Sequence, residues 1–384
     1  MKTSIAVALV LSLTFFVSCS KSNNAAKTGT DSTQVTPVVT IGTISGGLGV
    51  YAAGYETFYK VGSDSLPVAA GAPRVAKIWK DGAGYNMTDG SYDAVANAVW
   101  ANGVDVYAVG FERNADSIQV ATLWKDGKSI RLGDGKNNSV ANGIYVYGSD
   151  VYVAGNIVTN TVSAATLWKN GTAASLDNGG VANSVYVYGN DVYVCGSDPA
   201  GAARIWKDGV GSALVNGGLG DANSVYVSGG DVYVAGTFEN NGVLPGYWKN
   251  GKWTLLNYSS GTATSIYVEA NKVLIAGEII TDPALWINGS ASPLYDSLSA
   301  TADPTKIHYF KVISVFGAGN HIRLAGYRTT HQAKESTTTH DLLVPILFTD
   351  GTSTTLDNGD SQATLKVFNK TGGKALSVFT ITPS

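Results

Sequence analysis

The chain has 384 residues, of which 46 are glycine, 20 are tyrosine and only two are methionine. Abundant glycine and aromatic residues are typical of short strands joined by tight turns, so the composition favours an all-β protein over one built from long helices. The 26 Lys and Arg residues are balanced by 29 Asp and Glu residues. The chain therefore has no strong positive field, which disfavours nucleic-acid binding.

The first 18 residues have the pattern of a secretory signal peptide. Lys2 precedes an apolar run from Ile5 to Val17, which is too short and too close to the terminus for a membrane-spanning helix. The run ends in "FVSC", which resembles the lipobox of bacterial lipoproteins, with Phe16 in the usual place of leucine. The resemblance implies that Cys19 is lipidated and becomes the mature N-terminus, whereas in an ordinary cleaved signal Cys19 would be incidental.

Residues 19–36 are predicted to be the lipidated cysteine and a flexible polar linker, and residues 37–384 a single domain. A lipid and a polar spacer would hold this domain close to a membrane surface, so we expect an envelope location, at the outer membrane, facing the periplasm or the cell surface. Cys195 is then the other cysteine of the chain. An internal disulfide is not expected, and the fold must be held by its core.

A fifteen-residue unit recurs along the domain. One copy is "ANSVYVYGNDVYVCG" at 182–196, and the others are at 40–54, 96–110, 141–155, 222–236, 263–277 and 312–326. In each copy, two runs of β-branched and aromatic residues flank a turn such as Gly-Asn, which predicts a hairpin. A following phrase such as "ATLWKNG" and a short run after it predict a second hairpin. Each repeat, of about 40 residues, thus contributes four strands.

Four strands in such a repeat correspond to one blade of a β-propeller. The pair "DVYVAG" and "ATLWKNG" resembles the extracellular HAF-type repeats of bacteria and, more broadly, β-propeller repeat proteins. The resemblance covers about residues 38–358, and it implies a propeller fold outside the cytoplasm without implying an enzymatic activity. We expect seven blades. A further hairpin over residues 363–381 would either seal the ring against the first blade or open an eighth.

Three sets of repeated residues are predicted to be structural. A Trp of the third strand is expected to pack between blades. An Asn at the start of the first strand is expected to hydrogen-bond the backbone of the turn and lock blade to blade, with a ring of ligand-binding amides as the alternative. Turn acids are expected to serve the hairpin turns. The three sets are Trp79, Trp124, Trp168, Trp206, Trp248 and Trp286; Asn97, Asn142, Asn183 and Asn223; and Asp105, Asp150, Asp191 and Asp231.

The loops that follow the second strand of each repeat vary in length, whereas the turns at the opposite ends of the strands are alike. A rigid scaffold with variable loops is typical of a binding surface. Charged residues occur at the start of these loops, and they are either binding groups or a solvated face. The candidate binding residues are Glu56, Glu112, Arg113, Asp198, Glu239, Glu278 and Arg328.

All four histidines fall in or beside the seventh repeat, where His308, His331 and His340 are expected on the variable-loop side, close to Asp341, and His321 in an opposite turn. Three histidines on one side are compatible with a metal site, but their spacing matches no ligand signature, so no metal site or cofactor is assigned. The sequence contains no known catalytic phrase, and no catalytic residue is assigned.

Two hypotheses remain. The first is a non-catalytic, lipid-anchored propeller, expected as a monomer, that binds a glycan or envelope protein through the variable loops. The second is an extracytoplasmic hydrolase or lyase that acts on a polysaccharide with carboxylates or histidines of the same side.

Overall fold

The computed structural model describes residues 40–57, 73–215, 218–240, 242–257, 260–269, 272–280, 282–294, 308–318, 321–332, 340–349, 352–355 and 378–381. The chain divides into two units, Met1–Pro37 and Val38–Ser384, and the described residues belong to the second. The predicted signal peptide and linker, with Cys19, lie outside the described residues. Within the described part, no helix is long and apolar enough to cross a membrane.

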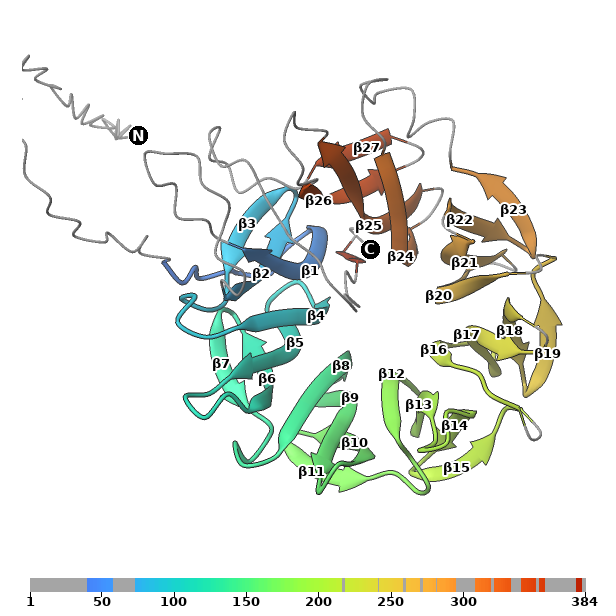
Figure 1. The fold of residues 1–384 in the computed structure, drawn as a ribbon, viewed down its shortest axis with the longest axis horizontal. Helices are drawn as coiled ribbons and strands as arrows, with labels where there is room; N and C mark the ends of the chain where they lie inside the picture. Colours follow the sequence, from blue (N-terminus) through green and yellow to red (C-terminus); the bar gives the residue numbers. More distant parts are fainter. Residues whose placement is uncertain are drawn as a thin grey trace, which may run out of the picture. The chain divides into compact units, whose positions relative to one another are not determined.

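The described strands of the second unit form seven four-stranded antiparallel sheets placed around a common centre (Figure 1). We number them sheets 1 to 7. In sheets 2 to 7 the strands follow one another in chain order, and the first strand of each lies nearest the centre. Successive antiparallel four-stranded sheets in this arrangement are the blades of a β-propeller. The predicted all-β class and the four-stranded blades are therefore confirmed.

The strands have the following bounds. Sheet 1 contains β1 (Gly49–Thr57), β2 (Arg74–Lys80), β3 (Ala83–Asn86) and β28 (Val378–Ile381). Sheet 2 contains β4 (Ala94–Ala101), β5 (Val106–Arg113), β6 (Gln119–Lys125) and β7 (Lys128–Arg131). Sheet 3 contains β8 (Asn138–Tyr147), β9 (Asp150–Thr159), β10 (Val162–Lys169) and β11 (Thr172–Ser175). Sheet 4 contains β12 (Val181–Tyr188), β13 (Asp191–Ser197), β14 (Ala203–Lys207) and β15 (Val210–Ala213).

Sheet 5 contains β16 (Ala222–Ser228), β17 (Asp231–Glu239), β18 (Val243–Lys249) and β19 (Lys252–Leu255). Sheet 6 contains β20 (Gly261–Glu269), β21 (Lys272–Ile279), β22 (Asp282–Ile287) and β23 (Ser290–Pro293). Sheet 7 contains β24 (His308–Ala318), β25 (His321–Gln332), β26 (His340–Thr349) and β27 (Thr352–Thr355).

The outer hairpin of sheet 3 shows how the repeated turn sequence produces this geometry. Lys169 lies opposite Thr172, and the two residues between them, Asn170 and Gly171, have φ angles of 51° and 83°. Asn and Gly are the residues that adopt such positive angles at low cost. The Asn170 side chain also accepts a hydrogen bond from the backbone N–H of Val151 at 2.8 Å, so the outer turn is tied to the inner hairpin.

The repeated Trp side chains form the core between neighbouring sheets, as predicted. Each of the six is at most 1% exposed. The ring of Trp206 in sheet 4 shares a buried cluster with Tyr152 and Ala154 of sheet 3, and its indole N–H donates to the backbone oxygen of Asp177 at 2.7 Å. Cys195 is fully buried on β13, at the place that Ala154 and Ala235 hold in sheets 3 and 5.

Sheet 1 differs from the prediction. The first copy of the repeat was expected to form the inner hairpin at 40–54, but residues 40–48 contain no strand, and β1 is the second strand of its sheet. The innermost place is taken by β28, which pairs with β1 from Gly49 opposite Ile381 to Ala52 opposite Val378. Val378–Ile381 thus supplies the strand that the first copy lacks, as in the sealing alternative of the two expected. Residues 363–377 of the predicted hairpin lie outside the described residues.

Candidate functional site

The variable face is the side of the sheets that carries the loops between the second and third strands and the connections from one sheet to the next. In an antiparallel four-stranded sheet these connections emerge at one end, and the two short hairpin turns emerge at the other, which we call the turn face. On the variable face, the charged residues of sheets 1 and 2 make the contacts described below.

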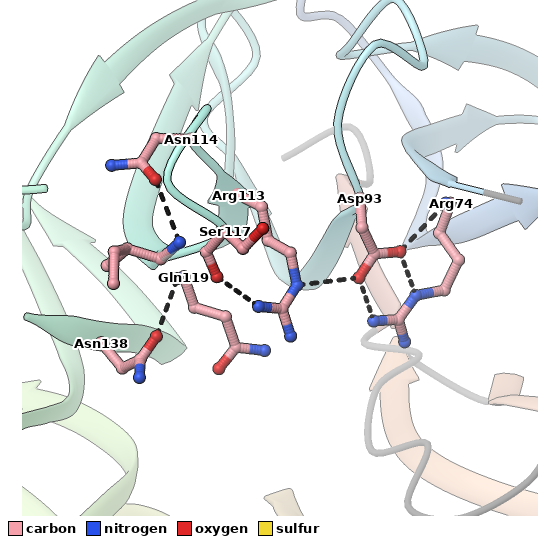
Figure 2. Close-up of polar contacts among 8 residues, drawn as sticks. Arg74, Asp93, Arg113, Asn114, Ser117, Gln119 and Asn138 are labelled. Atoms are coloured by element: carbon pink, nitrogen blue, oxygen red, sulfur yellow. Dashed lines mark hydrogen bonds and ion pairs between the residues drawn. The ribbon is translucent and has the colours of Figure 1, made fainter. Parts of the chain in front are cut away.

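An arginine pair meets one carboxylate where sheets 1 and 2 adjoin (Figure 2). Asp93 directly precedes β4 and accepts hydrogen bonds from Arg74 of β2, at 2.7 Å from Nε and 2.6 Å from Nη2. Arg113 of β5 places its Nε 3.7 Å from the same carboxylate and donates from Nη1 to the backbone oxygen of Ser117 at 2.5 Å. Two-point contact of a guanidinium with a carboxylate fixes both groups geometrically. The three side chains thus join neighbouring sheets.

Two aromatic rings lie next to the guanidinium group of Arg74. The Cζ atom of Arg74 lies 5.2 Å from the ring centre of Tyr55 and 5.5 Å from that of Phe111. The side chains of Arg74, Asp93 and Arg113 keep exposed fractions of 32%, 24% and 37%. We call these five residues the Arg74 cluster. It combines fixed aromatic surface with partly accessible charge.

The electrostatics of the Arg74 cluster follow from these contacts. Burial tends to raise the pKa of Asp93, but the hydrogen bonds and charge of Arg74 outweigh it, so the pKa of this carboxyl is lowered. Burial tends to lower the pKa of Arg74, and the bonds to Asp93 outweigh it and raise that pKa. Burial raises the pKa of Tyr55. The cluster therefore keeps its charges at neutral pH.

Glu56 is not a surface binding residue, contrary to the prediction. Its carboxylate forms an ion pair with Lys77 of β2, and the two side chains are 4% and 2% exposed. Two charges buried together need each other, because neither has access to water. Glu56 therefore belongs to the interior of sheet 1.

Glu112 occupies the equivalent place in sheet 2 but has a different environment. Thr122 stands on β6 where Lys77 stands on β2, since each lies two residues before the conserved Trp of its strand. Burial, followed by repulsion from Asp89, raises the pKa of Glu112, while Arg131 opposes the shift. Glu112 is thus a half-buried carboxyl that takes up a proton more readily than an ordinary glutamate.

The remaining predicted residues lie in separate sheets. Asp198 closes its own loop in sheet 4, because its Oδ1 accepts the backbone N–H groups of Ala200 and Ala202 at 2.9 Å each. Glu239 ends β17 as an exposed residue, and Glu278 lies half-buried on β21. Arg328 is on β25, and its side chain is outside the described part. The structure thus brings Arg113 into the Arg74 cluster, and it distributes the other predicted residues around the face.

The histidine side chains also lie outside the described part, although the strands place their backbones. His331 lies opposite Asp341 and His308 opposite Thr330. His321, expected in a turn, is the first residue of β25. Among the side chains that the structure describes, no group of three His, Cys, Asp or Glu residues is placed to hold a metal ion.

The repeated Asn residues link neighbouring sheets, which confirms the predicted locking of blade to blade. Each stands at a β-bulge, such as the one between Ala141 and Gly143, and donates from Nδ2 to the residue before the next bulge. Asn142 contacts the oxygen of Ala182 at 3.0 Å in this way. The acceptors are strand residues rather than turn residues. We call the four the amide belt: Asn97, Asn142, Asn183 and Asn223.

A second ring of side chains was not predicted from the sequence. Three residues after the extra residue of each bulge, an aromatic residue stands on the first strand of each of sheets 2 to 7, and the rings of neighbouring sheets in this series contact one another. The centres of Tyr145 and Tyr186 are 4.6 Å apart, and those of Tyr226 and Tyr267 are 5.1 Å apart. We call this set the aromatic belt: Trp100, Tyr145, Tyr186, Tyr226, Tyr267 and Phe316. The recurring Tyr of "VYV" was its sequence signal.

Four members of the aromatic belt are tyrosines of neighbouring sheets, Tyr145, Tyr186, Tyr226 and Tyr267, whose rings contact one another in this order. Burial, together with the nearness of the next phenol, raises the pKa values of Tyr145, Tyr186 and Tyr226 far above the ordinary one. All four tyrosines keep part of their surface accessible. The hydroxyl groups therefore stay neutral at any physiological pH.

The comparisons with known proteins found matches among solved structures. No protein-family model and no curated protein matches the sequence. Solved structures with similar folds include the β-propeller domain of the Trilobed protease from Pyrococcus furiosus, at 12% identity and a TM-score of 0.44 over 84% of this chain and 98% of that one. An exo-β-1,3-galactanase from Bifidobacterium bifidum, described as putative, matches at 12% identity and a TM-score of 0.34 over 59% and 93%.

An acylaminoacyl peptidase from Pyrococcus horikoshii matches at 14% identity and a TM-score of 0.36 over 68% of this chain. This chain spans about half of that protein, with 48% covered. With TM-scores below 0.5, these three similarities carry no conclusion about this chain.

Proposed function

We propose that this chain is a lipid-anchored, extracytoplasmic β-propeller of seven blades that binds a glycan or an envelope protein through its variable face. The Arg74 cluster carries the proposal. It presents two partly exposed arginines, Arg74 and Arg113, and the half-buried Tyr55, which neighbouring sheets hold in place beside the buried ring of Phe111. Arginine and aromatic residues are the types enriched at binding hot spots. Side chains fixed before binding lose little entropy when a partner arrives.

A second candidate function rests on Glu112. A glycosidase needs one carboxyl whose pKa is raised so that it can protonate the leaving oxygen. Burial and Asp89 raise the pKa of Glu112 in this direction. The hydrolase hypothesis is the weaker one, because Glu56 and Asp198, the predicted acids of sheets 1 and 4, are engaged in contacts of their own sheets.

The binding experiment uses the full chain with Cys19→Ser, which should remain soluble, on a glycan array and in capture from an envelope fraction. Arg113→Ala should lower the affinity for a captured partner about tenfold, because it removes a partly exposed cation of the variable face. Lys207→Ala is the matched control on the turn face, where its side chain is 53% exposed. Equal binding by both variants would contradict the proposal. The hydrolase alternative requires cleavage of a bound polysaccharide that Glu112→Gln abolishes.

The same chains test the anchor by metabolic labelling with radioactive palmitate. The wild type and Cys195→Ser should be labelled, since Cys195 is buried, and Cys19→Ser should not. Label retained by Cys19→Ser would contradict lipidation at that residue.

A further inference from the structure

The amide belt and the aromatic belt lie on the same strands, on the innermost edges of the sheets that face the common centre (Figure 1). The amide belt is at the start of each strand and so lies toward the variable face. The aromatic belt is three residues further along in sheets 2 to 5, about 10 Å deeper at the rise of an extended strand. Both belts keep part of their surface accessible.

The orientation of each Asn amide is fixed by its partner. Asn97, Asn183 and Asn223 each place Nδ2 2.9 Å from a backbone oxygen. Since a carbonyl oxygen can only accept, the amide must present its NH₂ group there, and its Oδ1 atom must face elsewhere. In the described part of the chain none of these Oδ1 atoms accepts a hydrogen bond, and none is among the buried atoms that lack a partner. They are accessible acceptors.

The chemistry of the two belts selects the ligand. The belts consist of Asn, Tyr, Trp and Phe and carry no charge, so they offer neither the cations that an anion needs nor the carboxylates that Ca²⁺ and Mg²⁺ prefer. Amide oxygens accept from hydroxyl groups, tyrosine hydroxyls donate and accept, and aromatic rings cover apolar C–H surface. A neutral polyol with apolar ring faces matches all three groups.

We propose that the amide and aromatic belts together bind one end of a neutral oligosaccharide, which enters from the variable face. The inference goes beyond the proposed function, because it adds a site on the central edges of the sheets, separate from the Arg74 cluster, and names its ligand class. Sites of this kind combine aromatic surface with a few fixed polar groups that set orientation.

The test titrates the full chain carrying Cys19→Ser with cellohexaose, laminarihexaose, maltohexaose, mannohexaose and xylohexaose by calorimetry. A variant combining Tyr145→Phe, Tyr186→Phe and Tyr226→Phe keeps the stacked rings and removes the hydroxyls. Its control combines Tyr152→Phe, Tyr193→Phe and Tyr233→Phe, the tyrosines of the second strands that lie beneath Lys169, Lys207 and Lys249. We expect at least one neutral hexasaccharide to bind, with about tenfold weaker affinity in the belt variant and a change within twofold in the control.

Three results would overturn the inference. Binding that the belt variant leaves intact but Arg113→Ala abolishes would place the ligand at the Arg74 cluster, and the proposed function would stand. Binding of oligogalacturonate or of an extended peptide in place of the neutral sugars would contradict the ligand class. Absence of any hexasaccharide binding at millimolar concentration, with an envelope protein still captured, would reject the belt site alone.

Melting curves of the two triple variants show whether the belt variant is folded. If it is destabilised, Asn183→Thr serves as the second variant. Thr264 reaches the corresponding oxygen natively, since its Oγ1 lies 3.4 Å from the oxygen of Val312, although the same hydroxyl also lies 3.0 Å from the oxygen of Ala276 in its own sheet. The Thr variant should keep the sheets joined and lose one amide oxygen, so its affinity should fall. An unchanged affinity in this variant would count against the amide belt.

Discussion

At the scale of single residues, two acids at equivalent places in sheets 1 and 2 have different properties, because one of them has a lysine partner and the other has a threonine in that place. Glu56 and Glu112 both follow a conserved glycine by two residues. Lys77 buries Glu56 in an ion pair, whereas Thr122 stands in the matching place of sheet 2, and Glu112 keeps a raised pKa. The difference is present in the sequence, as Lys77 in "AKIW" and Thr122 in "ATLW". Only the pairing of β1 with β2 shows that Lys77 reaches Glu56.

Asp93 should make stability depend on acid pH. Its pKa in the fold lies below the ordinary value of 3.8 because Arg74 outweighs the effect of burial. The stabilisation is therefore present above about pH 4 and is lost as the pH falls through the lowered pKa of the folded state. Asp93→Asn should lower the free energy of unfolding by about 1–2 kcal/mol at pH 7, where charge-assisted bonds are lost and partial exposure weakens them.

Urea denaturation at pH 7 and at pH 3 measures this difference. The variant should lose less stability than the wild type between the two pH values. Asp105→Asn is the control, since it breaks a contact with Lys125 that is more exposed, and it should have a smaller effect. A larger effect in this control would show that the Asp93 contact between sheets is not special.

At the scale of elements, the repeated bulge explains why one residue type recurs at the start of the first strands. The bulge inserts one extra residue, and that residue is Asn97, Asn142, Asn183, Asn223 or Thr264 in sheets 2 to 6. An unpaired extra residue can direct its side chain to the neighbouring sheet. In sheet 7 the same place is held by Ile313, which packs instead against the core shared with sheet 1.

Asn142→Ala should destabilise the protein by about 1 kcal/mol, because one hydrogen bond between sheets is lost. Asn142→Thr should restore part of this loss, since Thr264 bonds across the corresponding interface between sheets 6 and 7. Urea denaturation of the two variants and the wild type provides the measurement. If Thr were no better than Ala, the contribution would come from the shape of the amide rather than from its hydrogen bond.

The sequence predicted strands and hairpins well, because their signals are local. Alternating apolar residues and turns such as that at Asn170 and Gly171 specify a hairpin without reference to the rest of the chain. The prediction of the innermost strand of sheet 1 was wrong for the opposite reason. That strand is Val378–Ile381, which lies more than 300 residues from its partner β1 along the chain, and no local pattern distinguishes a closing strand from the start of another blade.

The candidate site was predictable only in part, again because the residues that meet in it are separated along the chain. Arg113 was predicted from its place just beyond the conserved Gly110, whereas the roles of Arg74 and Asp93 depend on the contact between two sheets. The aromatic belt was not predicted, because a Tyr between β-branched residues is also common in ordinary strands. Contacts between repeats turn such ordinary residues into a continuous surface.

At the scale of the whole propeller unit, the ring of contacts depends on β28, which is one of the shortest described strands. β28 pairs with β1 over four residues and also contacts β24 of sheet 7 and β4 of sheet 2. Without it, β1 would present an unpaired edge toward the centre, and sheets 7 and 2 would lose a common neighbour. Closure of a repeat array in this way couples its first and last repeats, so that they unfold together.

Removal of residues 378–384 should therefore cost more than its four residue pairs suggest. Loss of the pairing alone should lower the free energy of unfolding by about 2–4 kcal/mol, and sheets 1 and 7 should then unfold before the others, which broadens the urea transition. Removal of residues 382–384 alone, beyond the strand, is the matched control and should leave the transition unchanged. A peptide of residues 374–384 added in trans should restore the sharp transition of the truncated chain, because it can pair with β1 as β28 does. A truncated chain with the midpoint and sharpness of the wild type would show that the ring is held without the C-terminal strand.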